Sequence, residues 1–168
     1  MKSASAKDAV GALYLGRFLD RIYFVDKPIA WRPSPAQAGT YQAVEVPVGF
    51  VTDLASVPRV FWSFLPTDGE YAFAAIIHDY LYWTQCRSRE TCDNILRLAM
   101  ADLGVSNFTA GIIFRAVRLG GQSSWDSNTK LKAQGERRVL VQYPDGPGIR
   151  WENWKKRQDV YAPTDGHC

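Results

Sequence analysis

The stretch GEYAFAAIIHDYLYW, from Gly69 to Trp83, decides the fold of this chain. Its large apolar residues recur at the i, i+3, i+4, i+7 and i+8 spacing of a helix that faces a protein core; they are Phe73, Ile76, Ile77, Tyr80 and Leu81. Just upstream, Thr67 and Glu70 have the spacing of a capping box, which predicts where the helix begins. The sequence therefore predicts a core helix from about Glu70 that carries His78 and Asp79 within a run of apolar residues.

Two further helices are expected after this one. The second has an apolar inner stripe formed by Cys92, Ile95, Ala99 and Leu103. Ser88 is a favourable N-cap residue for this helix, and Gly104 would end it. A third helix is expected from Ser106 to Leu119, because the consecutive Gly120 and Gly121 would stop it.

The residues before the helices have the composition of strands. The segments Asp20–Trp31 and Thr40–Val51 are rich in β-branched and aromatic residues. In the second segment, valines alternate with polar or small residues, which is the period of a half-buried strand. A late strand is expected at Arg137–Pro144.

These elements predict an α+β fold, with a small antiparallel N-terminal sheet packed on about three helices and an extended C-terminal arm. A chain of 168 residues, of which 46% are hydrophobic, has the size and composition of a single globular domain. We expect residues 1–66 to be mainly strands, residues 67–121 to form the helical layer, and residues 122–168 to form the C-terminal arm.

The charge of the chain is nearly balanced, with 20 basic and 17 acidic residues, so nucleic acid is not an expected partner. The basic excess is local: eight basic residues against three acidic ones lie between Lys130 and Arg157. Tryptophans flank these charges, which favours a contact surface for another protein. The expected partner-binding residues are Trp151, Trp154, Lys155, Lys156 and Arg157.

The three cysteines, Cys86, Cys92 and Cys168, have no metal-type spacing and imply no disulfide framework. The N-terminus lacks the apolar stretch of a signal peptide, and no segment is long and apolar enough to span a membrane. We therefore expect synthesis in a reducing cytoplasm.

His78 and Asp79 raise a question of partners, because a buried carboxylate either protonates or finds a hydrogen-bond donor. The segment VTDLASVPR, from Val51 to Arg59, offers Asp53, Ser56 and Arg59. Asp93 lies at the boundary of the inner stripe of the second helix, where its side chain can turn toward His78. We expect one polar cluster made of Asp53, Ser56, Arg59, His78, Asp79 and Asp93.

The order of these motifs resembles a known family. The motifs are VPVGFVTDLASVPR, then AAIIHDYLY, then SRETCDNILRLAM, and finally GGQSSW. Together, over roughly Val44 to Trp125, they resemble the phage-associated domain of unknown function numbered thirteen fifty-three. Because the function of that family is unknown, the resemblance implies a context rather than a chemistry: a product of a bacteriophage or prophage, incorporated in a virion.

Three interpretations of the polar cluster remain open. In the first, Asp53, His78 and Asp93, with or without Asp79, would hold a divalent metal, Mn, Zn or Ca, that activates water. Alternatively, Ser56 would be a nucleophile with His78 as its base and either Asp79 or Asp93 as the orienting acid. In the third interpretation the cluster is structural: Asp53 caps a turn, Arg59 pairs with Asp79 or Asp93, and His78 is a hydrogen-bonded core residue.

Two classes of function follow from these interpretations. The first is a virion- or tail-associated component that docks onto other phage structural proteins. The second is a metal-dependent hydrolase that acts on the host envelope, with peptidoglycan as the cell-wall substrate. An enzyme requires an accessible cluster, whereas a docking component is compatible with a sealed one.

Overall fold

The computed structural model describes residues 9–54 and 70–165, and the predicted α+β fold is confirmed in these ranges. The strands are β1 (Ala9–Val10), β2 (Leu15–Arg17), β3 (Tyr23–Val25), β4 (Ile29–Trp31), β5 (Val44–Val46) and β6 (Val51–Thr52). The helices are α1 (Glu70–Thr84), α2 (Arg89–Asp102), α3 (Asn107–Ala133) and the short α4 (Trp151–Trp154). The predicted capping residue Thr67 lies outside the described residues.

The strands in the described ranges form two small antiparallel sheets rather than one. The first has the order β1-β4-β5, and Ile29 of β4 pairs with Val46 of β5. The second has the order β2-β3-β6, and Phe24 of β3 pairs with Val51 of β6. Strand β5 ends just before Pro47, which cannot donate to a ladder, and the chain then joins the second sheet.

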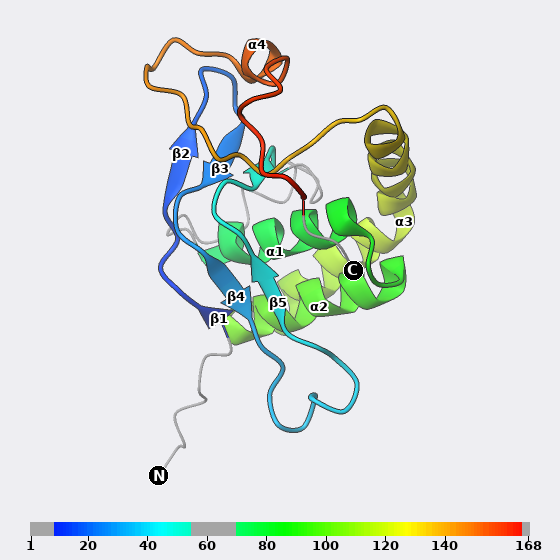
Figure 1. Cartoon of the computed structure of the whole chain (residues 1–168). Helices are drawn as coiled ribbons and strands as arrows, with labels where there is room; N and C mark the ends of the chain where they lie inside the picture. Colours follow the sequence, from blue (N-terminus) through cyan, green and yellow to red (C-terminus); the bar gives the residue numbers. More distant parts are fainter. Residues whose placement is uncertain (1–8, 55–69, 166–168) are drawn as a thin grey trace.

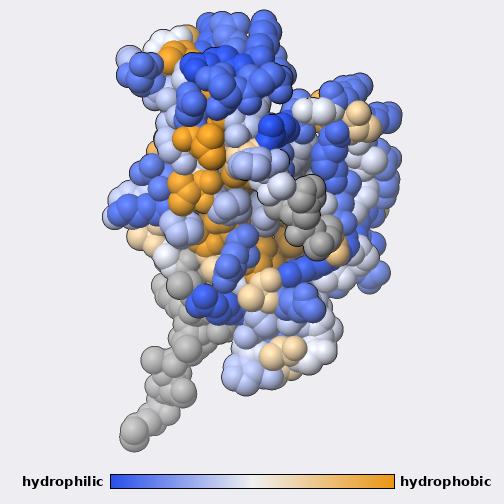
Figure 2. All heavy atoms as spheres, in the orientation of Figure 1, coloured by the Kyte–Doolittle hydropathy of each residue, from blue (hydrophilic) through white to orange (hydrophobic). Residues whose placement is uncertain are grey.

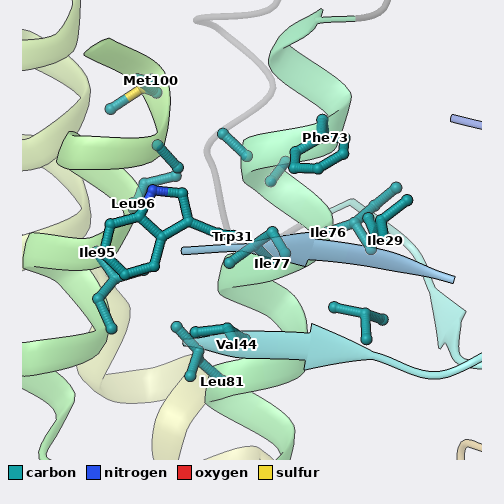
Figure 3. Close-up of a cluster of buried hydrophobic side chains, with 14 of the residues drawn as sticks. Ile29, Trp31, Val44, Phe73, Ile76, Ile77, Leu81, Ile95, Leu96 and Met100 are labelled. Atoms are coloured by element: carbon teal, nitrogen blue, oxygen red, sulfur yellow. The ribbon is translucent and has the colours of Figure 1, made fainter. Parts of the chain in front are cut away.

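Helix α1 lies at the centre of the fold, between the first sheet and the other two long helices (Figure 1). It is buried on almost every side, which is the arrangement expected for a helix that is apolar all round. Figure 3 shows Ile76 and Ile77 of α1 beside Ile29, Trp31 and Val44 of the sheet. Because α1 has little solvent-facing surface, any polar residue in its middle turns is placed inside the protein.

The predicted ends of α2 are confirmed. The Ser88 hydroxyl accepts a hydrogen bond from the backbone N–H of Thr91 at 3.1 Å, as an N-cap residue does. At the other end, Gly104 has a φ of 80°, and the Val105 N–H donates to the Met100 carbonyl at 2.9 Å. This is a Schellman ending, in which glycine adopts the left-handed conformation at little cost.

The predicted end of α3 is wrong, because the helix continues through Gly120 and Gly121 to Ala133. Its second half is held to the end of α1 by hydrogen bonds: Asn128 Nδ2 donates to the Tyr82 carbonyl at 3.1 Å, and Lys132 Nζ donates to the Thr84 carbonyl at 3.3 Å. Glycine lowers helix stability by only about 1 kcal/mol per residue, which such tertiary contacts can offset. The helical layer therefore ends at residue 133, not at residue 121.

The C-terminal arm packs on the second sheet and completes a second apolar core. Val139 forms an antiparallel bridge with Phe50, and Leu140 forms one with Tyr161. In Figure 1, α4 lies at the top of the molecule, beside the ends of β2 and β3. This core contains Phe18, Phe24, Val51, Leu140, Trp151, Trp154, Val160 and Tyr161.

The two tryptophans of the predicted contact surface do not lie at the surface. Trp151 is only 6% exposed and Trp154 only 8%, because both belong to the second core. Lys156 and Arg157 are exposed, and the top of the face shown in Figure 2 is hydrophilic. The arm is therefore part of the fold, and its charged residues form a solvated outer face.

The described cysteines differ from each other. Cys92 is free and buried, whereas Cys86 is disulfide-bonded, although the spacing of the cysteines implied no disulfide framework. Among the described helices, none combines the length and the apolar character needed to cross a bilayer.

Candidate functional site

Helix α1 sends His78 and Asp79 to two different sides, because consecutive helical residues point about 100° apart. His78 is fully buried and faces α2 and α3, where it meets Asp93. Asp79 is 6% exposed and faces the end of β6, where it accepts a hydrogen bond from the Thr52 hydroxyl. The described members of the predicted polar cluster are therefore divided into two parts by α1.

The first part is centred on Asp93, which is fully buried. Its Oδ1 atom lies 2.9 Å from Nε2 of His78 and accepts from the Tyr82 hydroxyl at 2.6 Å. Its Oδ2 atom accepts from Arg118 at 2.8 Å and more weakly from Arg89 at 3.4 Å. An ionised carboxylate can only accept hydrogen bonds, so Nε2 of His78 carries the proton. This set, called the Asp93 cluster below, consists of His78, Tyr82, Arg89, Asp93 and Arg118.

The electrostatics of this cluster keep Asp93 ionised. Burial alone would raise the pKa of Asp93, but the hydrogen bonds from His78, Tyr82 and Arg118 outweigh it and hold that pKa below its usual value of 3.8. Burial and the hydrogen bond to Asp93 raise the pKa of Tyr82 well above its usual range, so its hydroxyl remains a donor. A buried carboxylate surrounded by two arginines is a satisfied ion-pair network.

Gly121 is what allows α3 to approach this cluster. A Cβ atom at Gly121 would lie 2.5 Å from the Tyr82 hydroxyl and 3.4 Å from the Arg89 guanidinium. One turn further along, Trp125 packs edge-on against the Tyr82 ring, with centroids 5.1 Å apart. The GGQSSW motif, predicted as a helix stop, therefore marks a close contact in the middle of α3.

The second part of the predicted cluster lies at the end of β6. The Thr52 hydroxyl donates to Asp79 and accepts from the backbone N–H of Leu54 at 3.0 Å. Asp53, the next residue after Thr52, lies with Asp79 on the wall of a pocket. The segment that carries Asp53 therefore meets Asp79, whereas His78 belongs to the Asp93 cluster on another side of α1.

This pocket has a volume of about 370 Å³ and lies between α1, the second half of α3 and the end of β6. The described residues that line it are Asp53, Asp79, Tyr82, Ser123, Ser124, Ser127, Asn128, Leu131 and Arg138. A second pocket of about 240 Å³ shares Asp53, Leu131 and Arg138 with it and extends toward Trp151. We call the first of these the serine pocket.

The chemical capacity of the two parts differs. In the Asp93 cluster, both carboxylate oxygens are already engaged, and the remaining nitrogen of His78, Nδ1, is buried with no hydrogen-bond partner among the described residues. A general base must reach its substrate, so His78 has no open path to act as one. The serine pocket, in contrast, is a cavity lined by two carboxylates and several hydroxyl groups.

The predicted metal set is not assembled in the described part of the chain, where no group of three or more His, Cys, Asp or Glu side chains is arranged to hold an ion. His78 and Asp93 do meet, as predicted, but Asp53 lies at the serine pocket. Ser56, the predicted nucleophile, and Arg59, the predicted partner of Asp79, lie outside the described residues.

Sequence reasoning missed several residues of the site. Tyr82 lies four residues after His78, and Arg89 lies four residues before Asp93. Residues four apart are neighbours on a helix, so this spacing could have indicated both contacts. Arg118 reaches Asp93 across 25 positions of sequence, and Thr52 reaches Asp79 across 27, for which no local pattern exists.

Comparison with known proteins identifies the family of the chain. The family described as "Protein of unknown function (DUF1353)" matches residues 32–117, a little more than half of the chain. The chain belongs to the DUF1353 family. The match runs from the end of β4 into α3 and includes Thr52, Asp79 and the residues of the Asp93 cluster except Arg118, which lies one position beyond it.

One curated relative of this DUF1353 protein is the uncharacterized protein y4jT of Sinorhizobium fredii (strain NBRC 101917 / NGR234). The two chains are 34% identical over 88 residues, which are 51% of this chain and 26% of the relative. The chain thus spans about a quarter of the length of that relative. No solved structure matches the chain.

Proposed function

We propose that this DUF1353 protein is a small component of a bacteriophage or prophage particle that docks onto another protein of the particle through α3. The observation that carries the proposal is a stripe of large apolar side chains on the outer side of this helix. Phe108 is 79% exposed, Leu119 is 87% exposed, and Ile112 between them is 39% exposed. Their spacing of four and seven residues keeps them on one helical face.

The outer stripe is distinct from the core side of α3. Ala110, Ile113 and Val117 are the buried residues of the same turns, so the helix is apolar on two sides. A helix with a single neighbouring layer needs only one apolar face. Large apolar side chains that are exposed together on one helical face favour a contact site for another molecule, which supports docking.

Charge indicates the chemistry of the partner. Between residues 107 and 125, α3 carries no acidic residue, and Arg115 is exposed within the stripe between Ile112 and Leu119. A complementary surface would offer an apolar groove bordered by carboxylates. We therefore propose a partner protein with an acidic rim, rather than nucleic acid or a second copy of this basic face.

The hydrolase alternative has weaker support. A hydrolase built on His78 and Asp93 would need both residues to reach substrate, and both are fully buried and hydrogen-bonded to each other. A metal centre would need a set of ligands that the described residues do not group together. The complete burial of His78 and Asp93 favours a structural role for them in a docking protein.

The proposal is tested by fractionating phage particles released from the natural host. We expect the wild-type chain to sediment with the particles and the double variant Phe108→Ser, Leu119→Ser to remain in the soluble fraction. Both residues are exposed, so the double variant should keep the wild-type thermal unfolding midpoint. The chain is measured in each fraction by immunoblotting.

The matched control is Val141→Ser, which changes an apolar residue that is 54% exposed and lies outside α3. This variant should sediment with the particles as the wild type does. Equal incorporation of the α3 double variant, or the absence of the wild-type chain from particles, would contradict the proposal. So would concentration-dependent dimers of the wild-type chain that the double variant abolishes, because the stripe would then bind a second copy.

A further inference from the structure

A pocket of about 300 Å³ lies between α2, the first turns of α3 and the loop that joins β4 to β5. It shares no described lining residue with the serine pocket or with the Asp93 cluster. We call it the α2–α3 pocket. Its wall has a polar half and an apolar half, and the two halves point to different parts of a ligand.

The polar half consists of the side chains of Tyr41, Asn94, Arg97 and Asn107. Within the described part of the chain, none of these four side chains forms a hydrogen bond or an ion pair with another residue. Donors outnumber acceptors among them, because a guanidinium has five N–H groups and no acceptor, and each amide has two N–H groups. A ligand that accepts hydrogen bonds therefore meets donors that the described protein does not already use.

The charge of the pocket favours an anion. Arg97 is charged, and no acidic residue is present among the described lining residues. The Arg97 guanidinium lies over the Phe114 ring, 5.7 Å from its centroid, and this contact places the charge against α3. A guanidinium can form two parallel hydrogen bonds with one carboxylate, and its single charge balances that group.

The apolar half limits the rest of the ligand. It consists of Leu98, Ala101 and Ala110, beside the ring of Tyr41, which packs edge-on against Trp31 with centroids 6.4 Å apart. A small inorganic anion would leave this half of the wall uncovered. About 300 Å³ lies at the lower end of the range of small-molecule sites, roughly 300–1,000 Å³, and suits a single ring or a short branched chain.

We propose that the α2–α3 pocket binds a small monocarboxylate with an apolar body. The carboxylate pairs with Arg97 and accepts from the amides of Asn94 and Asn107, while the body covers the apolar half of the wall. The carboxylate belongs either to a free acid or to the C-terminal residue of a polypeptide. None of the three residues of the outer stripe on α3 lines the pocket, so this binding does not depend on the proposed docking.

The test is a titration of the full chain with three probes, followed by isothermal calorimetry and protein-detected NMR. Phenylacetate represents a free acid, N-acetylphenylalanine represents the end of a polypeptide, and phenylacetamide is the neutral counterpart of phenylacetate. We expect at least one of the two acids to bind at millimolar concentration or below, and phenylacetamide to bind at least about tenfold more weakly. The acid that binds more tightly identifies the source of the carboxylate.

Two matched pairs of variants locate the site. Arg97→Gln should weaken binding of the acid about tenfold, whereas Arg115→Gln removes the same charge from an exposed position of α3 outside the pocket and should bind as the wild type does. Ala101→Leu fills the pocket from an exposed position of α2 and should abolish binding, whereas Ala133→Leu, at the exposed end of α3, should not. All four variants should keep the wild-type unfolding midpoint, because the changed positions are exposed and both glutamine and leucine are good helix formers.

Three results would overturn the proposal. The first is that neither acid binds at millimolar concentration. The second is that phenylacetamide binds as tightly as phenylacetate, because the charge of Arg97 would then have no role. The third is that Arg97→Gln and Ala101→Leu both bind the acid as the wild type does, because the acid would then lie elsewhere on the protein.

Discussion

At the scale of single residues, Asp93 links three helices. Its carboxylate lies on α2 and accepts hydrogen bonds from His78 and Tyr82 of α1 and from Arg118 of α3. Side chains from three elements thus depend on one buried charge. Truncating one member of such a network leaves the others without partners, which is more costly than the net contribution of the intact network.

The variant Asp93→Asn tests this role. The amide has the size of the carboxylate, but its NH2 group would face the guanidinium of Arg118 or Arg89, so donors would meet donors. We expect a loss of about 3 kcal/mol in the free energy of unfolding, measured by urea denaturation. Asp126→Asn, at an exposed position on α3, should change it by less than about 0.5 kcal/mol.

The pH dependence of the same variants follows from the lowered pKa of Asp93. In the unfolded chain Asp93 takes up its proton near pH 3.8, whereas in the folded chain it stays ionised to a lower pH. The stabilisation due to ionised Asp93 is therefore complete well above pH 3.8. It is lost as the pH falls through the lower pKa of the folded state. The difference between wild type and Asp93→Asn should therefore be constant above about pH 5 and shrink toward pH 3. A difference that grows on acidification would contradict the assignment.

Local spacing explains which parts of the site were predictable. Asp93 was expected to turn toward His78 because the second helix places it at the edge of an apolar stripe, and the contact is present at 2.9 Å. Arg118 of α3 was not expected as a partner of Asp93, although it donates to that carboxylate at 2.8 Å. That pairing depends on how α3 packs on α2, which the local sequence does not specify.

At the scale of elements, α3 shows how packing overrides local propensity. Two consecutive glycines predict a helix end, because glycine is a poor helix former. The structure uses them differently: Gly120 is exposed with open space around it, whereas Gly121 is buried against Tyr82. The start of the same helix at Ser106 was predictable, because capping depends on residues only three positions apart.

The pair Gly120→Ala and Gly121→Ala separates these two roles. Alanine at position 120 meets no atom within 4 Å and should stabilise the protein by about 0.5–1 kcal/mol through its helix propensity. Alanine at position 121 gains the same propensity but pushes Tyr82 away from Asp93, so we expect a net loss of about 1–3 kcal/mol. Thermal and urea unfolding measure both. Equal stabilisation by the two variants would show that α3 does not approach α1 this closely.

At the scale of the whole molecule, the fold has two apolar cores, and the strands are divided between them. The first joins β4 and β5 to the three long helices, and the second joins β3 and β6 to the C-terminal arm. The first was largely predictable, because strong helical periodicity and alternating valines specify it. The second was not, because Trp151 and Trp154 among basic residues resemble an interface until the arm is seen to pack on the second sheet.

The variant Trp151→Ala tests whether the arm is part of the fold. The Trp151 ring packs on Phe18, with centroids 5.4 Å apart, and lies 6.4 Å from the ring of Tyr161. Its removal should leave a cavity and lower the free energy of unfolding by about 3–5 kcal/mol, measured by urea denaturation. Lys156→Ala, at an exposed position of the same segment, should change it by less than about 0.5 kcal/mol.

Hydrogen exchange gives a second measurement of the same prediction. The Val51 N–H donates to the Arg138 carbonyl at 2.7 Å, and the Leu140 N–H donates to the Gly49 carbonyl at 3.0 Å, so both amides report on the seam between the second sheet and the arm. In Trp151→Ala these two amides should exchange faster, because local opening of the seam becomes easier. Unchanged protection together with a loss of less than about 1 kcal/mol would mean that Trp151 contributes little to the core. A role for this tryptophan as an external contact would then be favoured over its role in the fold.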